Sequence, residues 1–182
     1  MVRARLLANW VITHKQYFDK ALAIDPNYKN ALKDKGNALS HQGNYDQAIT
    51  YYDKALAIDP NDKVALNGKG NALVDQGNNT QAIQYYDKAL AIDPNDEVAL
   101  NGKGNALVDQ GNNTQAIQYF DKALGIDPNF KEALNDKGNA LYYQGNYTQA
   151  IQYYDKALAI DPNYKNALDD KQTVLSKLGH SP

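Results

Sequence analysis

Residues 61–94 have the sequence NDKVALNGKGNALVDQGNNTQAIQYYDKALAIDP, and residues 95–128 have the sequence NDEVALNGKGNALVDQGNNTQAIQYFDKALGIDP. These two 34-residue segments differ at only three positions: Lys63 against Glu97, Tyr86 against Phe120 and Ala91 against Gly125. Self-similarity at a fixed period of this length indicates a repeat architecture, in which each unit packs on its neighbours. The tandem repeat therefore decides the fold class.

The same frame extends over most of the 182-residue chain. We predict four complete repeats and two partial ends: an N-terminal capping helix or partial repeat over 1–26, repeats over 27–60, 61–94, 95–128 and 129–162, and a C-terminal capping helix over 163–182. The partial ends leave two origins open: a fragment of a longer array, or an engineered protein.

Each repeat contains two helical patterns. In residues 61–94, Leu66 and Leu73 recur at the spacing of one helix face, and Ala82 and Tyr86 do so after an intervening glycine. No segment alternates between apolar and polar residues over several positions, so we expect no sheet. The sequence thus predicts two amphipathic helices in every repeat.

The boundaries of these helices carry local signals. Gly77 is suited to the left-handed conformation that closes a first helix. Asn78 or Thr80 is expected to cap the second helix through its side chain. Pro94 ends that helix, because proline has no backbone N–H and disfavours helix in the residue before it.

Small residues indicate where neighbouring helices meet. Gly70, Ala82 and Ala89 have little side chain, so backbones can approach closely there, while Leu66 and Tyr86 fill the remaining space. A single helix pair is too small to bury its apolar face alone. We therefore expect the pairs to stack on one another.

This pattern resembles the tetratricopeptide repeat family. The resemblance rests, in residues 61–94 and at the equivalent positions of the other repeats, on Leu66, Gly70, Leu73, Ala82, Tyr86, Ala89 and Pro94. It covers residues 17–179 and implies an all-α fold, a right-handed superhelical solenoid of antiparallel helix pairs. The chain departs from the family pattern where lysines stand at an often apolar position: Lys35, Lys69, Lys103 and Lys137. We expect their stems to pack and their ammonium groups to reach outward.

The two ends differ from the complete repeats. We expect one long helix from Arg3 to about Ile24, or a helix with a break near Asn9. Leu7 and Trp10 either cap the first repeat or form an apolar patch that recruits a partner. Near the other end, Gln172 replaces the packing glycine. A more polar helix at that place is typical of the cap that covers the open face of a repeat array.

Composition excludes several function classes. There are 19 basic and 21 acidic residues, a formal charge of −2, so we expect no nucleic-acid partner and no membrane partner. The chain has no cysteine, and its three histidines are widely separated. We predict no catalytic residues, no metal site and no cofactor, and we expect a cytoplasmic protein because no secretory signal is evident.

The resemblance also implies where a partner binds. In the resembled family, the first helices of successive repeats line a concave groove that takes extended peptides. Carried over to this chain, the groove residues are Lys33, Asn37, Val64, Asn67, Gly68, Asn71, Val98, Asn101, Gly102, Asn105, Asn135, Asn139 and Tyr142.

Two features of this surface are open to two interpretations. Asn37, Asn71, Asn105 and Asn139 form a ladder of amides that either pairs with a bound peptide backbone, or bonds neighbouring helices or faces water. Gly68 and Gly102 either leave room for a ligand side chain or are copied by recent duplication.

We predict a scaffold that binds a neutral to mildly basic protein or peptide segment. Lys33 and Asn37 fit the first part of the clamp with which some relatives grip acidic chaperone tails, but Gly68, Val98 and Gly102 stand where further donors are needed. The alternative function is a structural self-assembly module, a homo-oligomer formed through the end faces of the array.

Overall fold

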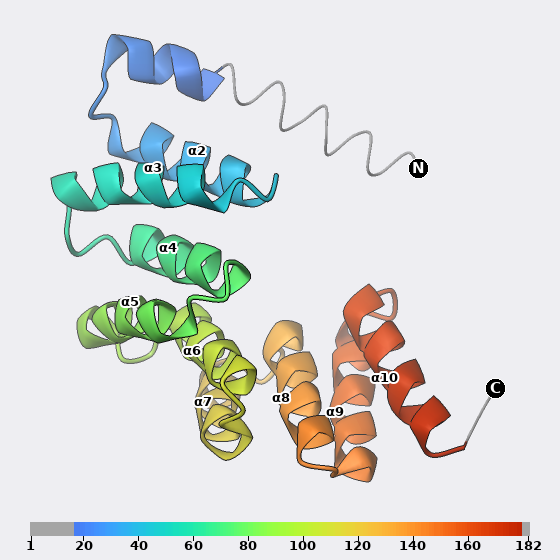
Figure 1. Ribbon diagram of the computed structural model, residues 1–182. Helices are drawn as coiled ribbons and strands as arrows, with labels where there is room; N and C mark the ends of the chain where they lie inside the picture. The colour runs from blue at the N-terminus through green and yellow to red at the C-terminus, as the bar shows by residue number, and fades with distance from the viewer. Residues whose placement is uncertain (1–16, 180–182) are drawn as a thin grey trace. The chain divides into compact units, whose positions relative to one another are not determined.

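The computed structural model describes residues 17–179, and every regular element in that part of the chain is a helix (Figure 1). Residues 17–24 are helical, and the helices that follow are α2 (Lys29–Ser40), α3 (Tyr45–Ile58), α4 (Lys63–Asp75), α5 (Asn79–Ile92), α6 (Glu97–Asp109), α7 (Asn113–Ile126), α8 (Lys131–Tyr143), α9 (Tyr147–Ile160) and α10 (Lys165–Lys177). The expected all-α fold of antiparallel helix pairs is confirmed. Leu7, Trp10 and the start of the helix expected from Arg3 lie outside the described residues.

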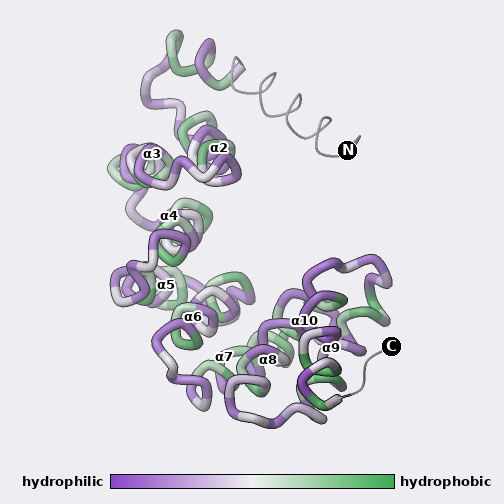
Figure 2. The backbone as a smooth tube through the Cα atoms, turned by 45° about the vertical axis from the view of Figure 1, so that its right-hand side comes forward, coloured by the Kyte–Doolittle hydropathy of each residue, from purple (hydrophilic) through white to green (hydrophobic). Residues whose placement is uncertain are grey.

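The chain divides into two compact units. Unit 1 comprises Met1–Ile92 and contains α2 to α5, and unit 2 comprises Asp93–Pro182 and contains α6 to α10. Each helix pair lies within one of the 34-residue frames of the sequence. Apolar and polar residues are interspersed along the helices, as expected where one face of a helix is buried (Figure 2).

Glycine closes the first helix of each pair. Gly77 has a φ of 77°, and Gly111 of 78°, which is the left-handed region that only glycine enters without strain. The N–H of Asn78 then donates to the carbonyl oxygen of Leu73 over 2.8 Å, which completes the turn. The sequence prediction for this boundary is confirmed.

Side-chain caps differ between the first and second helices of the pairs. Asn112 and Asn146 occupy the N-cap positions of α7 and α9 but make no side-chain capping bond. In the second repeat, the amide of Asn78 donates to Gln76, and a cap of α5 by Asn78 or Thr80 stays a prediction. The first helices α4 and α6 are capped by Asp62 and Asp96, whose Oδ1 atoms accept the N–H of the third helical residue.

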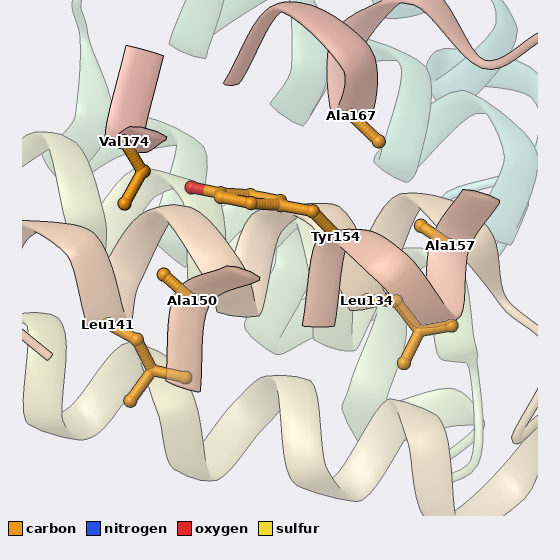
Figure 3. Packing of buried hydrophobic residues seen from close by; sticks show 7 residues of the cluster. All are labelled: Leu134, Leu141, Ala150, Tyr154, Ala157, Ala167 and Val174. Atoms are coloured by element: carbon orange, nitrogen blue, oxygen red, sulfur yellow. The ribbon is translucent and has the colours of Figure 1, made fainter. Parts of the chain in front are cut away.

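The core of each pair is a buried aromatic ring set against a glycine. The ring of Tyr154 on α9 is fully buried, with Ala167 on one side and its hydroxyl end directed towards Val174 of α10 (Figure 3). A Cβ on Gly138 of α8 would lie 2.4 Å from this ring, and one on Gly70 of α4 would lie 2.6 Å from its equivalent. The close approach inferred from the small residues is thus explained by aromatic side chains.

The lysines that recur in each repeat join consecutive helices through ion pairs and contacts with aromatic rings. Lys69 forms an ion pair with Asp53 of the preceding helix, and its Nζ lies 4.3 Å from the centroid of the Tyr85 ring. Lys69 is only 8% exposed. Its stem packs as expected, but its ammonium group is held between a carboxylate and an aromatic face instead of extending freely into water.

The glycine contacts predict opposite effects for two Gly→Ala substitutions. Gly70→Ala should lower the free energy of unfolding by about 1–3 kcal/mol, because the new methyl group meets the Tyr86 ring. Gly125→Ala on α7 should raise it by about 0.5–1 kcal/mol, because nothing lies within 4 Å and alanine favours helix. Urea unfolding followed by circular dichroism measures both. A Gly70→Ala chain as stable as the parent would contradict the packing described here.

Candidate functional site

The residues expected to line a groove fall into two groups, one in each unit. In unit 1, Lys33 and Asn37 lie on α2, and Val64, Asn67, Gly68 and Asn71 lie on α4. In unit 2, Val98, Asn101, Gly102 and Asn105 lie on α6, and Asn135, Asn139 and Tyr142 lie on α8. Each group forms part of a surface built from first helices of the repeats, which we call the first-helix surface of that unit.

Buried tyrosine hydroxyls orient most of the asparagine ladder. Within three helix pairs, a tyrosine Oη donates to an asparagine Oδ1 over 2.7 Å: Tyr52 to Asn37, Tyr86 to Asn71 and Tyr154 to Asn139. Burial raises the pKa of Tyr52 to about 12, so the hydroxyl stays protonated and able to donate. The amide oxygen is thereby engaged within the pair, and the amide N–H groups are turned towards other acceptors.

The third repeat breaks this pattern. Phe120 replaces the tyrosine, so Asn105 has no hydroxyl to accept from. Its Nδ2 donates instead to Oδ2 of Asp136 on α8 over 2.8 Å, and Asn101 donates to the same oxygen over 2.9 Å. The donor of Asn105 therefore joins α6 to α8, which is the interpretation in which the ladder bonds neighbouring helices.

A second carboxylate lies next along the first-helix surface of unit 2. Asn135, only 2% exposed, donates its Nδ2 to Oδ2 of Asp170 on α10 over 2.9 Å. Burial and the charge of Asp170 raise the pKa of Asp136, although hydrogen bonds from Asn101 and its neighbours oppose the shift. Asn101 and Asn135 thus donate within unit 2 to the carboxylates of Asp136 and Asp170.

The lysine expected to contact a ligand is engaged within unit 1. Nζ of Lys33 lies 2.8 Å from Oδ2 of Asp62, which also accepts from Lys29 over 3.1 Å. Burial alone would raise the pKa of Asp62, but the bonds from Lys33, the Ala65 N–H and Lys29 outweigh it and lower the pKa. Lys33 therefore contributes an internal ion pair that ties α2 to the capping residue of α4.

The space beside Gly68 is already filled. A Cβ at this position would lie 2.6 Å from the Tyr52 ring, so the glycine accommodates a tyrosine of the preceding pair. The room expected there for a ligand side chain is occupied. Val64 and Val98, by contrast, are exposed to 54% and 43% and offer apolar contact on the first-helix surfaces.

Tyr142 belongs to an aromatic cluster that the sequence did not indicate. Its ring centroid lies 5.4 Å from that of Tyr143 and 5.6 Å from that of Tyr147 at the start of α9. Nζ of Lys177 on α10 lies 4.9 Å from the Tyr142 centroid and 5.2 Å from the Tyr147 centroid. Only the proximity of Tyr142 to Tyr143 and Tyr147 along the chain could have suggested the grouping.

Metal-binding clusters and membrane-spanning helices are absent from the described residues. Over residues 17–179, no group of three or more His, Cys, Asp or Glu side chains is placed to hold a metal ion. In the same part of the chain, none of the helices combines the length and the apolar character that crossing a membrane requires. A cytoplasmic location stays a prediction from the sequence.

Comparison with known proteins gives one family and several similar folds. A family model described as tetratricopeptide repeat matches residues 15–63, 33–97 and 101–165. No curated protein matches this sequence. Among solved structures, YrrB, described as a TPR protein with an unusual peptide-binding site, is 27% identical with a TM-score of 0.65 over 92% of this chain and 88% of its own.

Two further structures show the same fold. MamA is 25% identical with a TM-score of 0.67, and the match covers 81% of this chain and 86% of that one. PilW, described as a widely conserved type IV pilus biogenesis factor, is 22% identical with a TM-score of 0.83, over 99% of this chain and 86% of that one. The likeness to PilW concerns the fold alone.

The raised pKa of Asp136 predicts a pH-dependent effect of Asp136→Asn. The folded chain binds this proton more tightly than the unfolded chain, so the associated stability is full at low pH and is lost as the pH rises through the folded pKa. Asp136→Asn should therefore raise the urea midpoint at pH 7, and the gain should shrink towards pH 4.

Asp34→Asn is the matched control, because Asp34 occupies the same repeat position on α2 and is exposed. It should change the midpoint little at either pH. A gain for Asp136→Asn that is equal at pH 4 and pH 7 would show that burial does not penalise the charged carboxylate.

Proposed function

Because the chain belongs to the tetratricopeptide repeat family, we propose that it is a non-catalytic scaffold whose first-helix surfaces bind an extended segment of a partner protein or peptide. The family fold generally mediates protein–protein interaction. Our proposal for this chain specifies which surface binds the partner and which chemical character the bound segment has.

The proposal rests on the asparagines oriented by buried tyrosines. Tyr52 and Tyr86 engage the Oδ1 atoms of Asn37 and Asn71, so that each side chain keeps N–H donors in a fixed orientation on the first-helix surface of unit 1. The backbone of an extended peptide presents carbonyl acceptors whatever its sequence. Donors fixed before binding lose little entropy when they bond such a carbonyl.

The charges on these surfaces favour a neutral to mildly basic segment. Lys33 is neutralised by Asp62 within unit 1, which leaves little positive charge to attract an acidic peptide. In unit 2, the first-helix surface carries Asp136 and Asp170. An acidic segment would be repelled there, whereas a basic one would be attracted at moderate ionic strength.

The alternative, self-association through the end faces, has one observation in its favour and one against it. Leu168 on α10 and Leu178, which directly follows α10, are exposed to 45% and 40%, although apolar side chains on a cap are usually covered. Gln172, however, stands where Gly138 admits the Tyr154 ring of its own pair, so no helix can pair with α10 in the manner of the complete repeats. We therefore rank partner binding above self-association.

The amide proposal is tested by replacing Asn37 and Asn71 with aspartate. Asn→Asp keeps the oxygen that accepts the tyrosine hydroxyl but removes the N–H donors, so the fold is preserved while two contacts are lost. Peptides selected from a random library on the parent chain should bind the double variant about five-fold or more weakly by calorimetry. The selected peptides should carry a net charge of zero or above.

The matched control is Asn61→Asp, the same chemical change at an exposed turn residue outside the surface. It should leave the affinity unchanged. Selection of no peptide at all would overturn the proposed function, and equal binding by the double variant would overturn the role of the amides.

Self-association is tested by light scattering over a wide concentration range. We expect a monomer mass throughout, because Gln172 prevents a further helix from pairing with α10 in repeat geometry. A mass that rises with concentration in the parent, and that falls to the monomer value in Leu168→Lys, would instead establish the alternative.

A further inference from the structure

The aromatic cluster of Tyr142, Tyr143 and Tyr147 holds a cation that the chain itself supplies. Lys177 places its Nζ over the rings of Tyr142 and Tyr147, 4.9 and 5.2 Å from their centroids. The faces of aromatic rings attract cations within about 6 Å of the centroid. Hydrogen bonds with Tyr147 and Tyr142 also raise the pKa of Lys177, which keeps its ammonium group charged.

The tyrosine at position 142 is particular to the fourth repeat. At this position the other three complete repeats have Ser40, Val74 and Val108. Tyr142 and Tyr147 pack partly against the core cluster of unit 2. Both are only half-buried, so part of each side chain remains at the surface.

The same surface of unit 2 carries negative charge. Asp136 precedes Tyr143 by seven residues on α8, and Asp170 precedes Lys177 by seven residues on α10. Two helical turns bring residues back to the same face, about 10 Å further along. Asp136 therefore lies on the same helix face as Tyr143, and Asp170 lies on the same helix face as Lys177.

These groups lie around one buried side chain. Burial is the main cause of the raised pKa of Tyr154, and Asp170, Tyr143, Tyr142 and Asp136 add to it in that order. Tyr142 and Tyr147 also pack against the core cluster that contains Tyr154. The rings and the carboxylates therefore belong to the same region of α8 to α10, and a positive group near the rings also feels the carboxylates.

We propose that this surface binds an arginine side chain of the partner segment, stacked on Tyr142 and Tyr147 in the place that Lys177 occupies in the free protein. The inference rests on the proposed function and specifies its ligand. A guanidinium group is planar and weakly hydrated, so it stacks on aromatic rings better than an ammonium group does. A lysine of the partner would only exchange one ammonium for another. Lys177 is thus an internal competitor that weakens the binding of other cations.

The test uses the full chain with ¹³C-labelled tyrosine and two short probes. The first is acetyl-Gly-Gly-Arg-Gly-Gly-amide, and the second replaces arginine with citrulline, which has nearly the same shape and no charge. The arginine probe should shift the ring resonances of Tyr142 and Tyr147 at low salt, and the citrulline probe should not. The shift should weaken as salt is added.

Lys177→Ala removes the competitor and should tighten the arginine probe by about two- to five-fold. Lys156→Ala is its matched control, because it removes an ammonium that lies 4.5 Å from the ring centroid of Tyr153. This control should leave the affinity for the probe unchanged.

Substitution of the two rings gives a second line of evidence. Tyr142→Phe with Tyr147→Phe keeps the aromatic faces and should retain binding, whereas Tyr142→Leu with Tyr147→Leu should abolish it. The Phe variants and Lys177→Ala keep the test decisive if the Leu variant fails to fold.

Equal shifts from the arginine and citrulline probes, or an affinity that Lys177→Ala leaves unchanged, would overturn this inference. The proposed function would survive that result if library peptides still bind the chain through Asn37 and Asn71. A failure of those peptides would count against the proposed function itself.

Discussion

The contact between a buried aromatic ring and a glycine on the neighbouring helix determines how the rest of each unit is arranged. Tyr52 occupies space that a Cβ on Gly36 or Gly68 would enter, so one ring sets the approach of α3 to both α2 and α4. Because interiors are close-packed, even one added methyl group would have to move a helix or the ring. The same ring carries a hydroxyl that reaches Asn37 on the edge of the pair. Packing in the core and the orientation of a surface amide therefore depend on a single side chain.

The third repeat is the one complete repeat in which the buried aromatic ring has no hydroxyl. Phe120 fills the same space as the tyrosines but has no hydroxyl, and in that repeat Asn105 donates to Asp136. The change from tyrosine to phenylalanine removes a donor from the amide oxygen, and the aspartate on α8 supplies an acceptor for the amide nitrogen. The hydroxyl of the buried ring thus decides which atom of the asparagine is engaged within the pair.

The sequence predicts the helices, turns and close contacts of this fold well. It predicts the hydrogen bonds and ion pairs of the side chains poorly. Helix pairs, the turn at Gly77 and the close contact at Gly70 follow from local patterns that are repeated four times, so each repeat supports the interpretation of the others. The ion pair between Lys33 and Asp62 could not be predicted, because Asp62 lies 29 residues further along the chain and also caps a helix. The asparagine ladder is a similar case. Its amides can face a ligand or a neighbour, and only the positions of the tyrosine hydroxyls decide which atom remains available.

The side of the helix pairs that carries Lys69 and Lys137 offers few free charges to a binding partner. Lys69 is held by Asp53 and by the ring of Tyr85, and Lys137 is held in the same way by Asp121 and Tyr153. These charges are neutralised within the units, so they offer little to a partner, and their loss would weaken the contact between consecutive helix pairs. The first-helix surface also carries internal bonds, such as those of Lys33 with Asp62 and of Asn135 with Asp170. It nevertheless leaves Val64 and Val98 exposed, and it has a tyrosine, Tyr142, where two other repeats have valine. Binding contacts on that surface therefore come from the side chains that these internal bonds leave exposed.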